Sequence, residues 1–145
     1  MNEPSVRVTD AEWEVMRTVW ANASVTSKNV VDILEEKTDW KKATIKTYLG
    51  RLVSKGALIT ETEGRKYIYS PAVTEEEMVK AYIEDILSRV CNKLAGKVIN
   101  QLISEVSLSH NDLDNLKSSL IQKERVAVDE VVCECVNGQC ECHLH

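Results

Sequence analysis

The sequence lacks a long apolar segment, a secretory leader and any catalytic motif that we can identify. No run of about 18 apolar residues occurs in its 145 residues, so we expect no membrane-spanning helix. Residues 1–5 do not have the basic-then-apolar order of a signal peptide, and a cytoplasmic location is therefore expected. We find no nucleophile paired with a base, no glycine-rich phosphate loop and no HExxH pattern, so we expect that the protein is not an enzyme.

Positive charge is scarce except in one window of a chain whose formal net charge is −5. Residues 37–66 carry eight basic and three acidic side chains, whereas residues 1–36 and 74–145 are both net acidic. Such a window can hold DNA while the rest of the chain stays acidic, although a solvated surface is the simpler alternative. The eight basic residues are Lys37, Lys41, Lys42, Lys46, Arg51, Lys55, Arg65 and Lys66.

Four helix starts share one pattern. An apolar residue directly precedes a residue with a capping hydroxyl, and a second apolar residue follows five positions after the first. The caps are Thr9, Thr26, Thr74 and Ser109. Helices are expected at about 10–20, 27–37 and 42–55, and the third should end at Gly56. Two strands, 57–62 and 66–70, are expected to follow and to be joined by a turn. The expected buried residues are Val30, Ile33 and Leu34 in the second helix and Ile45, Leu49, Leu52 and Val53 in the third. This order predicts a mainly α chain with a winged helix-turn-helix head.

Three further helices are expected at about 75–90, 92–107 and 110–125. Their apolar stripes are too large for three short helices to bury alone, which favours packing against a second copy over packing back onto the head. We therefore divide the chain into a DNA-binding domain (1–72), a helical dimerisation domain (73–126) and a tail (127–145).

The expected third helix has a polar, largely basic side that suits the major groove. Gly50 on this side would let the groove wall come close. At the hairpin tip, two basic residues are expected to meet the flanking DNA backbone. The candidate DNA-binding residues are Lys42, Thr44, Lys46, Thr47, Arg51, Arg65 and Lys66.

These segments resemble the penicillinase-repressor and copper-transport-repressor family of winged-helix proteins. The resemblance covers roughly residues 5–125 and rests on Thr9 to Met16, Trp20, Thr44 to Leu52, Lys55-Gly56 and Lys66 to Pro71. It implies a homodimeric repressor that is joined through its C-terminal helices and binds a palindromic operator.

Four of the five cysteines form a CxCxxxxCxC pattern: Cys133, Cys135, Cys140 and Cys142. In extended chain, residues i and i+2 point to the same side, and Asn137-Gly138 favours a type I′ turn that folds one CxC pair over the other. Four thiolates suit tetrahedral Zn²⁺ and, because they are soft, also Cu(I). Cys91 is expected to be a buried small hydrophobe rather than a ligand. His143 and His145 follow the cysteines, but we expect a frayed terminus there.

The tail resembles that of the copper-responsive members of the family. This resemblance implies that Zn(II) is bound in the DNA-bound form and that Cu(I), the inducer, displaces zinc and releases the DNA. A copper chaperone that delivers Cu(I) is a candidate partner. The alternatives are a structural zinc site, a disulfide switch, a metal-buffering protein and a repressor inactivated by proteolysis, as in the antibiotic-sensing branch of the family.

Overall fold

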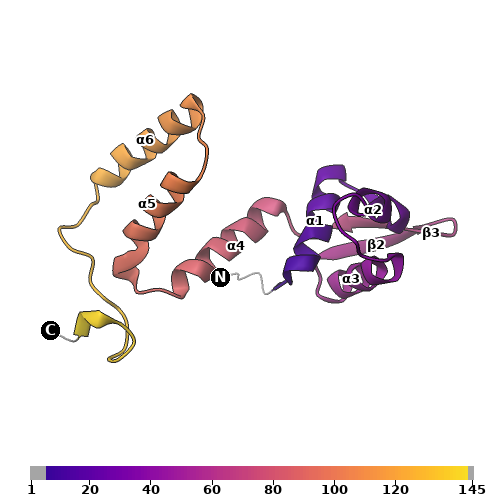
Figure 1. Ribbon diagram of the computed structural model, residues 1–145, viewed down its shortest axis with the longest axis horizontal. Helices are drawn as coiled ribbons and strands as arrows, with labels where there is room; N and C mark the ends of the chain where they lie inside the picture. The colour runs from indigo at the N-terminus through magenta and orange to yellow at the C-terminus, as the bar shows by residue number, and fades with distance from the viewer. Residues whose placement is uncertain (1–5, 144–145) are drawn as a thin grey trace. The chain divides into compact units, whose positions relative to one another are not determined.

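The structure, a computed structural model, describes residues 6–143 and is mostly helical with one small sheet (Figure 1). The chain divides into two compact units between Tyr82 and Ile83, so that the division falls inside a helix. In the part of the chain that the structure describes, no helix has the length and the apolar character needed to cross a membrane.

The first unit begins with three helices, α1 (Asp10–Asn22), α2 (Ser27–Leu34) and α3 (Lys42–Ser54). The hydroxyls of Thr9 and Thr26 cap α1 and α2, each accepting a hydrogen bond of 3.1 Å from a backbone N–H three residues on. Helix α3 ends as predicted at Gly56, whose φ of 83° reverses the chain. The backbone N–H groups of Gly56 and Ala57 donate to the carbonyls of Val53 and Leu52, which completes a Schellman cap.

A three-stranded antiparallel sheet follows, with the strand order β1-β3-β2. Strands β2 (Leu58–Glu63) and β3 (Lys66–Pro71) form the predicted hairpin, paired from Glu63↔Lys66 to Leu58↔Pro71. Strand β1 (Val25–Thr26) was not predicted, because two residues are too short to give an alternating pattern. It pairs with the other edge of β3, Val25 opposite Tyr69, and so ties the start of α2 to the wing.

The core of this unit lies between the three helices and the sheet. Helix α3 contributes Ile45, Leu49 and Leu52, which are fully buried as predicted, and Val53, which is only partly buried against the same core. In α2 the prediction is wrong at one position, because Val31 is buried and Ile33 is 44% exposed. The helix also ends at Leu34 rather than at Lys37, since the N–H groups of Lys37 and Thr38 both turn back to the Leu34 carbonyl.

The three further helices are present as α4 (Glu75–Ser88), α5 (Ala95–Glu105) and α6 (His110–Glu124). Thr74 caps α4 together with Glu77, and Ser109 caps α6 together with Asp112. The helix expected at 92–107 begins instead as a 3-10 turn, η1 (Asn92–Leu94). After α6 the chain has no regular structure until a second such turn, η2 (Glu141–His143).

Candidate nucleic-acid interface and thiol cluster

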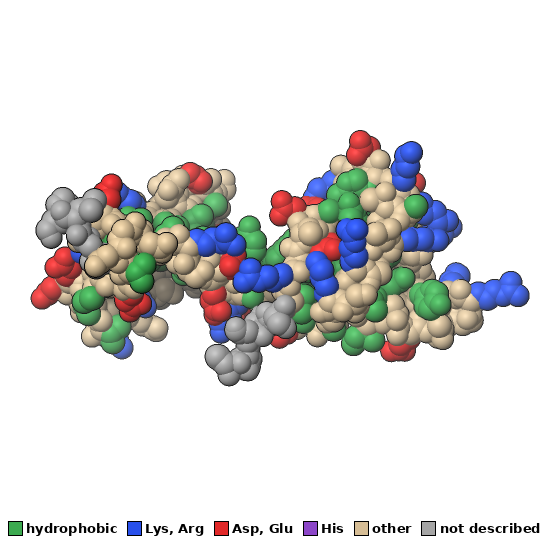
Figure 2. Space-filling view, turned by 90° about the horizontal axis from the view of Figure 1, so that it is seen from below, with side chains coloured by type: hydrophobic (Ala, Val, Ile, Leu, Met, Phe, Trp, Pro, Cys, Tyr) green, Lys and Arg blue, Asp and Glu red, His purple; other side chains and the backbone are tan. Residues whose placement is uncertain are grey.

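Helix α3 has an apolar face and, opposite it, a basic face. Opposite its buried leucines and isoleucine, six of the seven candidate DNA-binding side chains are exposed, and Thr44 is half-buried. The exposed ones on α3 are Lys42, Lys46, Thr47 and Arg51, while Arg65 and Lys66 lie exposed where the β2–β3 hairpin turns. Figure 2 shows blue Lys and Arg side chains over this unit on the face in view. The amphipathic arrangement leaves the basic face of α3 open to a partner.

Two of the eight basic residues in the positive window form ion pairs within the first unit. Lys37 pairs with Glu14, and Lys55 pairs with Glu12, each at 2.5 Å. Neither residue belongs to the seven candidate DNA-binding residues, and their ion pairs reduce the net positive charge of the window. Their partners lie on α1, which is remote in sequence and could not be identified from the window alone.

Gly50 lies on the exposed face of α3, where its missing side chain leaves open space. A Cβ atom built there would meet no atom within 4 Å, so packing inside the protein does not require glycine at this position. The hydroxyl of Thr47, one turn earlier, donates to the Ala43 carbonyl at 3.0 Å and still has lone pairs that can accept a hydrogen bond.

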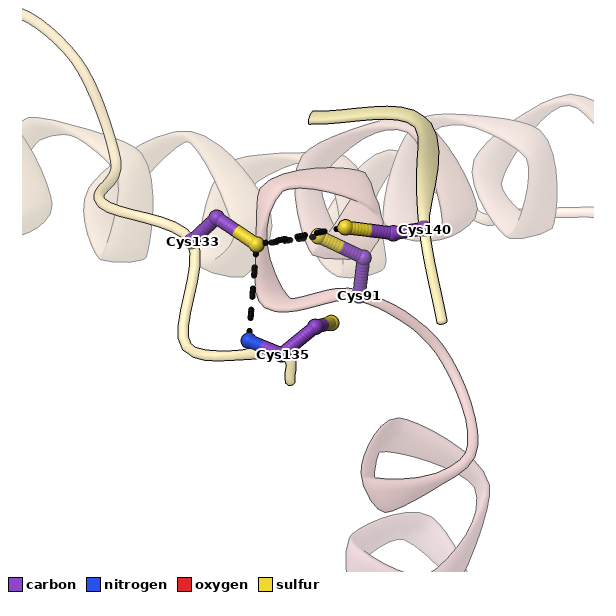
Figure 3. Close-up of side chains that lie close together, drawn as sticks. All are labelled: Cys91, Cys133, Cys135 and Cys140. Carbon is purple, nitrogen blue, oxygen red and sulfur yellow. Dashed lines mark hydrogen bonds between the residues drawn. The ribbon is translucent and has the colours of Figure 1, made fainter. Parts of the chain in front are cut away.

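The second unit brings all five cysteines of the chain together. The Sγ atoms of Cys91, Cys133, Cys135 and Cys140 all lie within 4.8 Å of one another (Figure 3). The distance between Sγ of Cys133 and Sγ of Cys140 is 3.4 Å. Four thiolates about 2.3 Å from a tetrahedral ion stand about 3.8 Å apart, so these thiols fit a thiolate-bound ion of the kind that Zn²⁺ forms.

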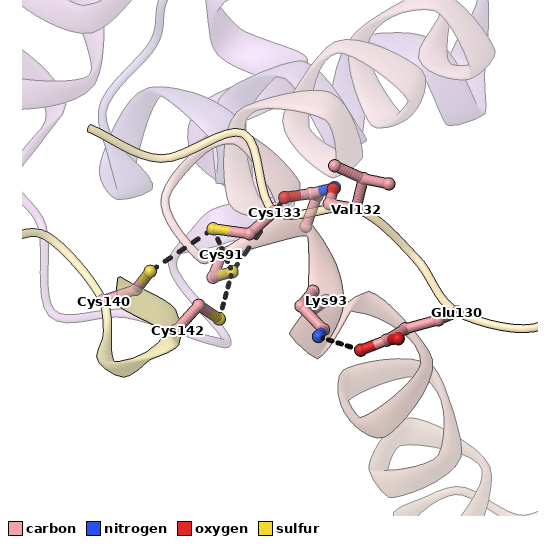
Figure 4. Close-up of polar contacts among 8 residues, drawn as sticks. Cys91, Lys93, Glu130, Val132, Cys133, Cys140 and Cys142 are labelled. Carbon is pink, nitrogen blue, oxygen red and sulfur yellow. Dashed lines mark hydrogen bonds and ion pairs between the residues drawn. The ribbon is translucent and has the colours of Figure 1, made fainter. Parts of the chain in front are cut away.

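Cys91, which we expected to be a buried hydrophobe remote from the tail, belongs to this cluster. It is buried, with 8% of its surface exposed, but its Sγ lies 3.6 Å from Sγ of Cys133 and 3.8 Å from Sγ of Cys142 (Figure 4). The expectation that Cys91 is a buried hydrophobe therefore holds for its burial but missed its place beside the tail sulfurs. The sequence feature that could have indicated this is the break between two helical patterns at residue 91. It places the thiol at a junction between helices rather than on a helix face.

The tail turns back between its two CxC pairs, as expected, but not in the expected way. The N–H of Gln139 donates to the Val136 carbonyl at 3.2 Å, which places Asn137 and Gly138 at the centre of a turn. Only Gly138 has a positive φ, of 93°. A type I′ turn requires positive φ at both central residues, so that assignment is wrong, and the single positive φ matches a type II turn.

Two neighbours of Cys91 hold the tail next to it. The side-chain amide of Asn92 donates to the Val132 carbonyl and accepts from the N–H of Glu134 at 2.9 Å. Lys93 Nζ lies 2.9 Å from a carboxylate oxygen of Glu130 (Figure 4). The Asn92 contacts flank Cys133 on both sides and so fix it opposite Cys91.

The contacts within the cluster shift the pKa values of three tail thiols in opposite directions. The N–H of Cys135, 3.4 Å from Sγ of Cys133, lowers the pKa of Cys133 to about 6 against the effect of desolvation, with help from the thiols of Cys140 and Cys91. Desolvation raises the pKa of Cys135 to about 12, and the thiol of Cys140, followed by desolvation, raises that of Cys142 to about 12. Cys133 is therefore the tail thiol that ionises most readily, whereas a cation that binds Cys135 or Cys142 would have to displace a proton from the thiol.

Of the three histidine side chains, the structure describes that of His110. His110 is the first residue of α6, as expected for a helix-start residue. His143 ends the closing 3-10 turn, and His145 lies outside the described residues.

Three helices, a β hairpin and an exposed basic helix face define a winged helix-turn-helix DNA-binding regulator. The sequence matches the family model described as Penicillinase repressor over residues 8–122. The chain belongs to this family of transcriptional repressors, which are not enzymes.

Two curated relatives are similar over most of the chain. An uncharacterised 16.5 kDa protein from the ptsI 3′ region of Latilactobacillus sakei is 38% identical over 98% of this chain and 97% of its own length. The penicillinase repressor of Bacillus licheniformis is 30% identical over 76% of this chain and 86% of its own length.

Two solved structures are similar over about half of the chain. The monomeric form of Bacillus licheniformis BlaI, in complex with the blaP half-operator, is 38% identical and covers 49% of this chain and 87% of that one, with a TM-score of 0.45. The CopR repressor structure is 42% identical and covers 45% of this chain and 94% of that one, with a TM-score of 0.40.

Proposed function

We propose that this protein is a metal-responsive repressor of copper-homeostasis genes. The observation that carries the proposal is the presence, in one chain, of a winged-helix head of the penicillinase repressor family and a cluster of five thiols. The head accounts for DNA binding, and the thiols account for the signal that ends it.

The proposed DNA contacts follow the exposed faces of α3 and the hairpin. Helix α3 lies in the major groove, where Lys46 and Thr47 face base edges and Arg51 faces phosphate, and the hairpin reaches the neighbouring backbone. The support for this arrangement is the exposure of these side chains opposite a fully buried apolar face. The full proposed set is Lys42, Thr44, Lys46, Thr47, Arg51, Arg65 and Lys66.

The proposed repressor is a homodimer on a palindromic operator. Large apolar side chains are exposed on all three helices from α4 to α6, among them Ile83 (51%), Leu102 (56%) and Leu120 (59%). Exposure of this extent on successive helices favours burial against a second copy. A second head would then read the second half of a symmetric operator.

The proposed signal is a change of metal at the thiol cluster, and Cys133, Cys135, Cys140 and Cys142 are the ligands proposed from the spacing. The tail resembles that of the copper-responsive repressor CopY. The thiolates hold Zn(II) in the DNA-bound form and take Cu(I) in its place, after which the DNA is released. One Zn²⁺ or two Cu⁺ ions with four thiolates have the same net charge, so the signal is a change of geometry rather than of charge. A copper chaperone would deliver Cu(I).

A DNA-binding titration tests this proposal. Zinc-loaded protein is bound to fluorescent operator duplex, and Cu(I) is then added while anisotropy and released zinc are followed. We expect release of DNA together with zinc. Retention of DNA after copper has displaced the zinc would contradict the proposal.

A pair of variants in the same assay tests the DNA-binding face. Lys46→Ala removes an exposed charge from α3 and should weaken operator binding. Lys37→Ala removes a charge of the same kind that is already paired with Glu14 and should leave operator binding nearly unchanged. Equal losses would remove Lys46 from the proposed contacts.

A further inference from the structure

We propose that Cys91 is a ligand of the metal, so that the ion binds the tail to the junction between α4 and α5. This inference rests on the proposed metal response and adds to it a ligand that lies outside the CxCxxxxCxC pattern. It also supplies a physical route from the tail to the helices proposed to form the dimer.

The position of the Cys91 sulfur is the first argument. It lies 3.6 Å from a sulfur of the first CxC pair, Cys133, and 3.8 Å from a sulfur of the second, Cys142. It also lies within 4.8 Å of the sulfurs of Cys135 and Cys140. Cys91 is therefore in reach of both pairs, and a tetrahedral set of four thiolates can be completed with it.

The surroundings of Cys91 are the second argument. Its thiol contacts the sulfurs of Cys133 and Cys142 and lies 3.9 Å from the side-chain amide oxygen of Asn92. A buried cysteine that only fills space has no need of such sulfur contacts. A thiol turned toward other thiols is placed to bind a soft cation.

The docking of the tail is the third argument. Asn92 pairs with the backbone on both sides of Cys133, at Val132 and Glu134, and holds the first CxC pair against the junction. Helices α4 and α5 and the 3-10 turn between them hold the backbone of Cys91 in place. The ligand from the junction is therefore preorganised, and the tail ligands close on it.

Five thiols exceed the four that a tetrahedral ion requires. The four sulfurs that lie mutually within 4.8 Å include Cys91, and Cys142 is the cysteine with the exposed side chain. A chain without Cys142 should therefore still offer four thiolates, whereas one without Cys91 and Cys142 can offer only three.

Cobalt(II), used as a probe in place of zinc, counts these thiolates, because the sulfur-to-cobalt charge-transfer absorption grows with the number of Co–S bonds. The experiment compares full-length Cys142→Ala with Cys91→Ala/Cys142→Ala. We expect the absorption per bound cobalt to fall to about three quarters when the second substitution is added, since one of four ligands is lost. Val90→Ala in the same Cys142→Ala background changes a half-buried neighbour that carries no ligand and should not alter the absorption.

Equal absorption in Cys142→Ala and the double variant would overturn the proposal, as would a three-thiolate signal in Cys142→Ala alone. The single variant changes an exposed residue, so the second criterion holds even if the double variant fails to fold. The assay does not involve DNA. If Cys91 is a ligand but metals do not affect DNA binding, the proposed function fails and this inference stands. If copper releases the DNA but Cys91 is not a ligand, the proposed function stands and this inference fails.

Discussion

The ammonium group of Lys55, at the end of α3, lies 2.5 Å from a carboxylate oxygen of Glu12, which is 43 residues earlier on α1. Glu12 is 1% exposed and also accepts a hydrogen bond of 2.9 Å from the N–H of Thr9 on the same oxygen. Its other oxygen, Oε2, has no hydrogen-bond partner among the described residues. One buried carboxylate therefore joins the cap of α1 to the end of α3.

Lys55→Met should destabilise the first unit by about 1–3 kcal/mol, because it leaves a buried carboxylate without its charged donor. The matched control is Lys37→Met, which breaks an ion pair of the same length between side chains that are 54% and 30% exposed. That change should cost less than about 1 kcal/mol. Urea unfolding followed by tryptophan fluorescence reports this unit, since Trp13, Trp20 and Trp40 all lie in it. Equal costs for the two variants would contradict the role given to Glu12.

The same pair predicts a dependence on pH. Burial raises the pKa of Glu12, but the hydrogen bonds from Lys55 and Thr9 outweigh it and leave the pKa below the usual 4.5. A carboxylate whose pKa is lowered by folding contributes stability that is present above 4.5 and lost as the pH falls below it. The stability gap between wild type and Lys55→Met should therefore narrow as the pH falls below 4.5. Urea titrations at several pH values measure this gap, and a gap that stays constant would refute the prediction.

Gly50→Ala should separate stability from DNA binding. The added Cβ meets no atom in the protein, so alanine should stabilise α3 by about 0.5–1 kcal/mol. If this face lies against DNA, the methyl group occupies space that the groove wall needs, and operator affinity should fall. Ser54→Ala, at the exposed end of the same helix, is the control and should leave operator affinity unchanged. Thermal unfolding and anisotropy check both quantities. Unchanged operator affinity in a stabilised Gly50→Ala would mean that the groove does not approach here.

Leu102→Asp should dissociate the proposed dimer. Leu102 is 56% exposed on α5, and a carboxylate buried in an interface without a partner costs several kcal/mol. Asn100→Asp introduces the same charge at an exposed polar position of the same helix and should leave the dimer intact. Sedimentation velocity of the full-length variants at micromolar concentration gives the masses. A wild type that sediments as a monomer would rule out the dimer.

Asn92→Ala should weaken zinc binding by about 10–100-fold, the usual effect of losing a group that orients metal ligands. The amide holds the backbone on both sides of Cys133, so the tail loses its alignment with Cys91. Glu130→Gln breaks the Lys93 ion pair, whose carboxylate is 77% exposed, and is the control that should change the affinity little. Competition with a chelating dye measures both affinities. If the control loses as much affinity as Asn92→Ala, the charge of the tail rather than its alignment governs binding.

Much of the fold could be predicted because its signals are local. Thr9, Thr26 and Ser109 bond to backbone only three residues away, and Gly56 ends α3 through its own φ, so short segments of sequence contain all that these features require. The alternation of apolar and basic residues along α3 likewise predicted which side is buried. These interactions form between neighbours in the chain and need no knowledge of its path in space.

The sequence by itself thus determined the helices, the hairpin, the basic face and the spacing of the tail cysteines. Only the tertiary structure decided that Cys91 joins Cys133, that Lys55 is bound to Glu12, and that Val25 pairs with Tyr69. Each of these contacts links residues more than 40 positions apart. The partner in such a contact is set by how packed elements cross in space, and the local patterns at either residue contain no information about that crossing.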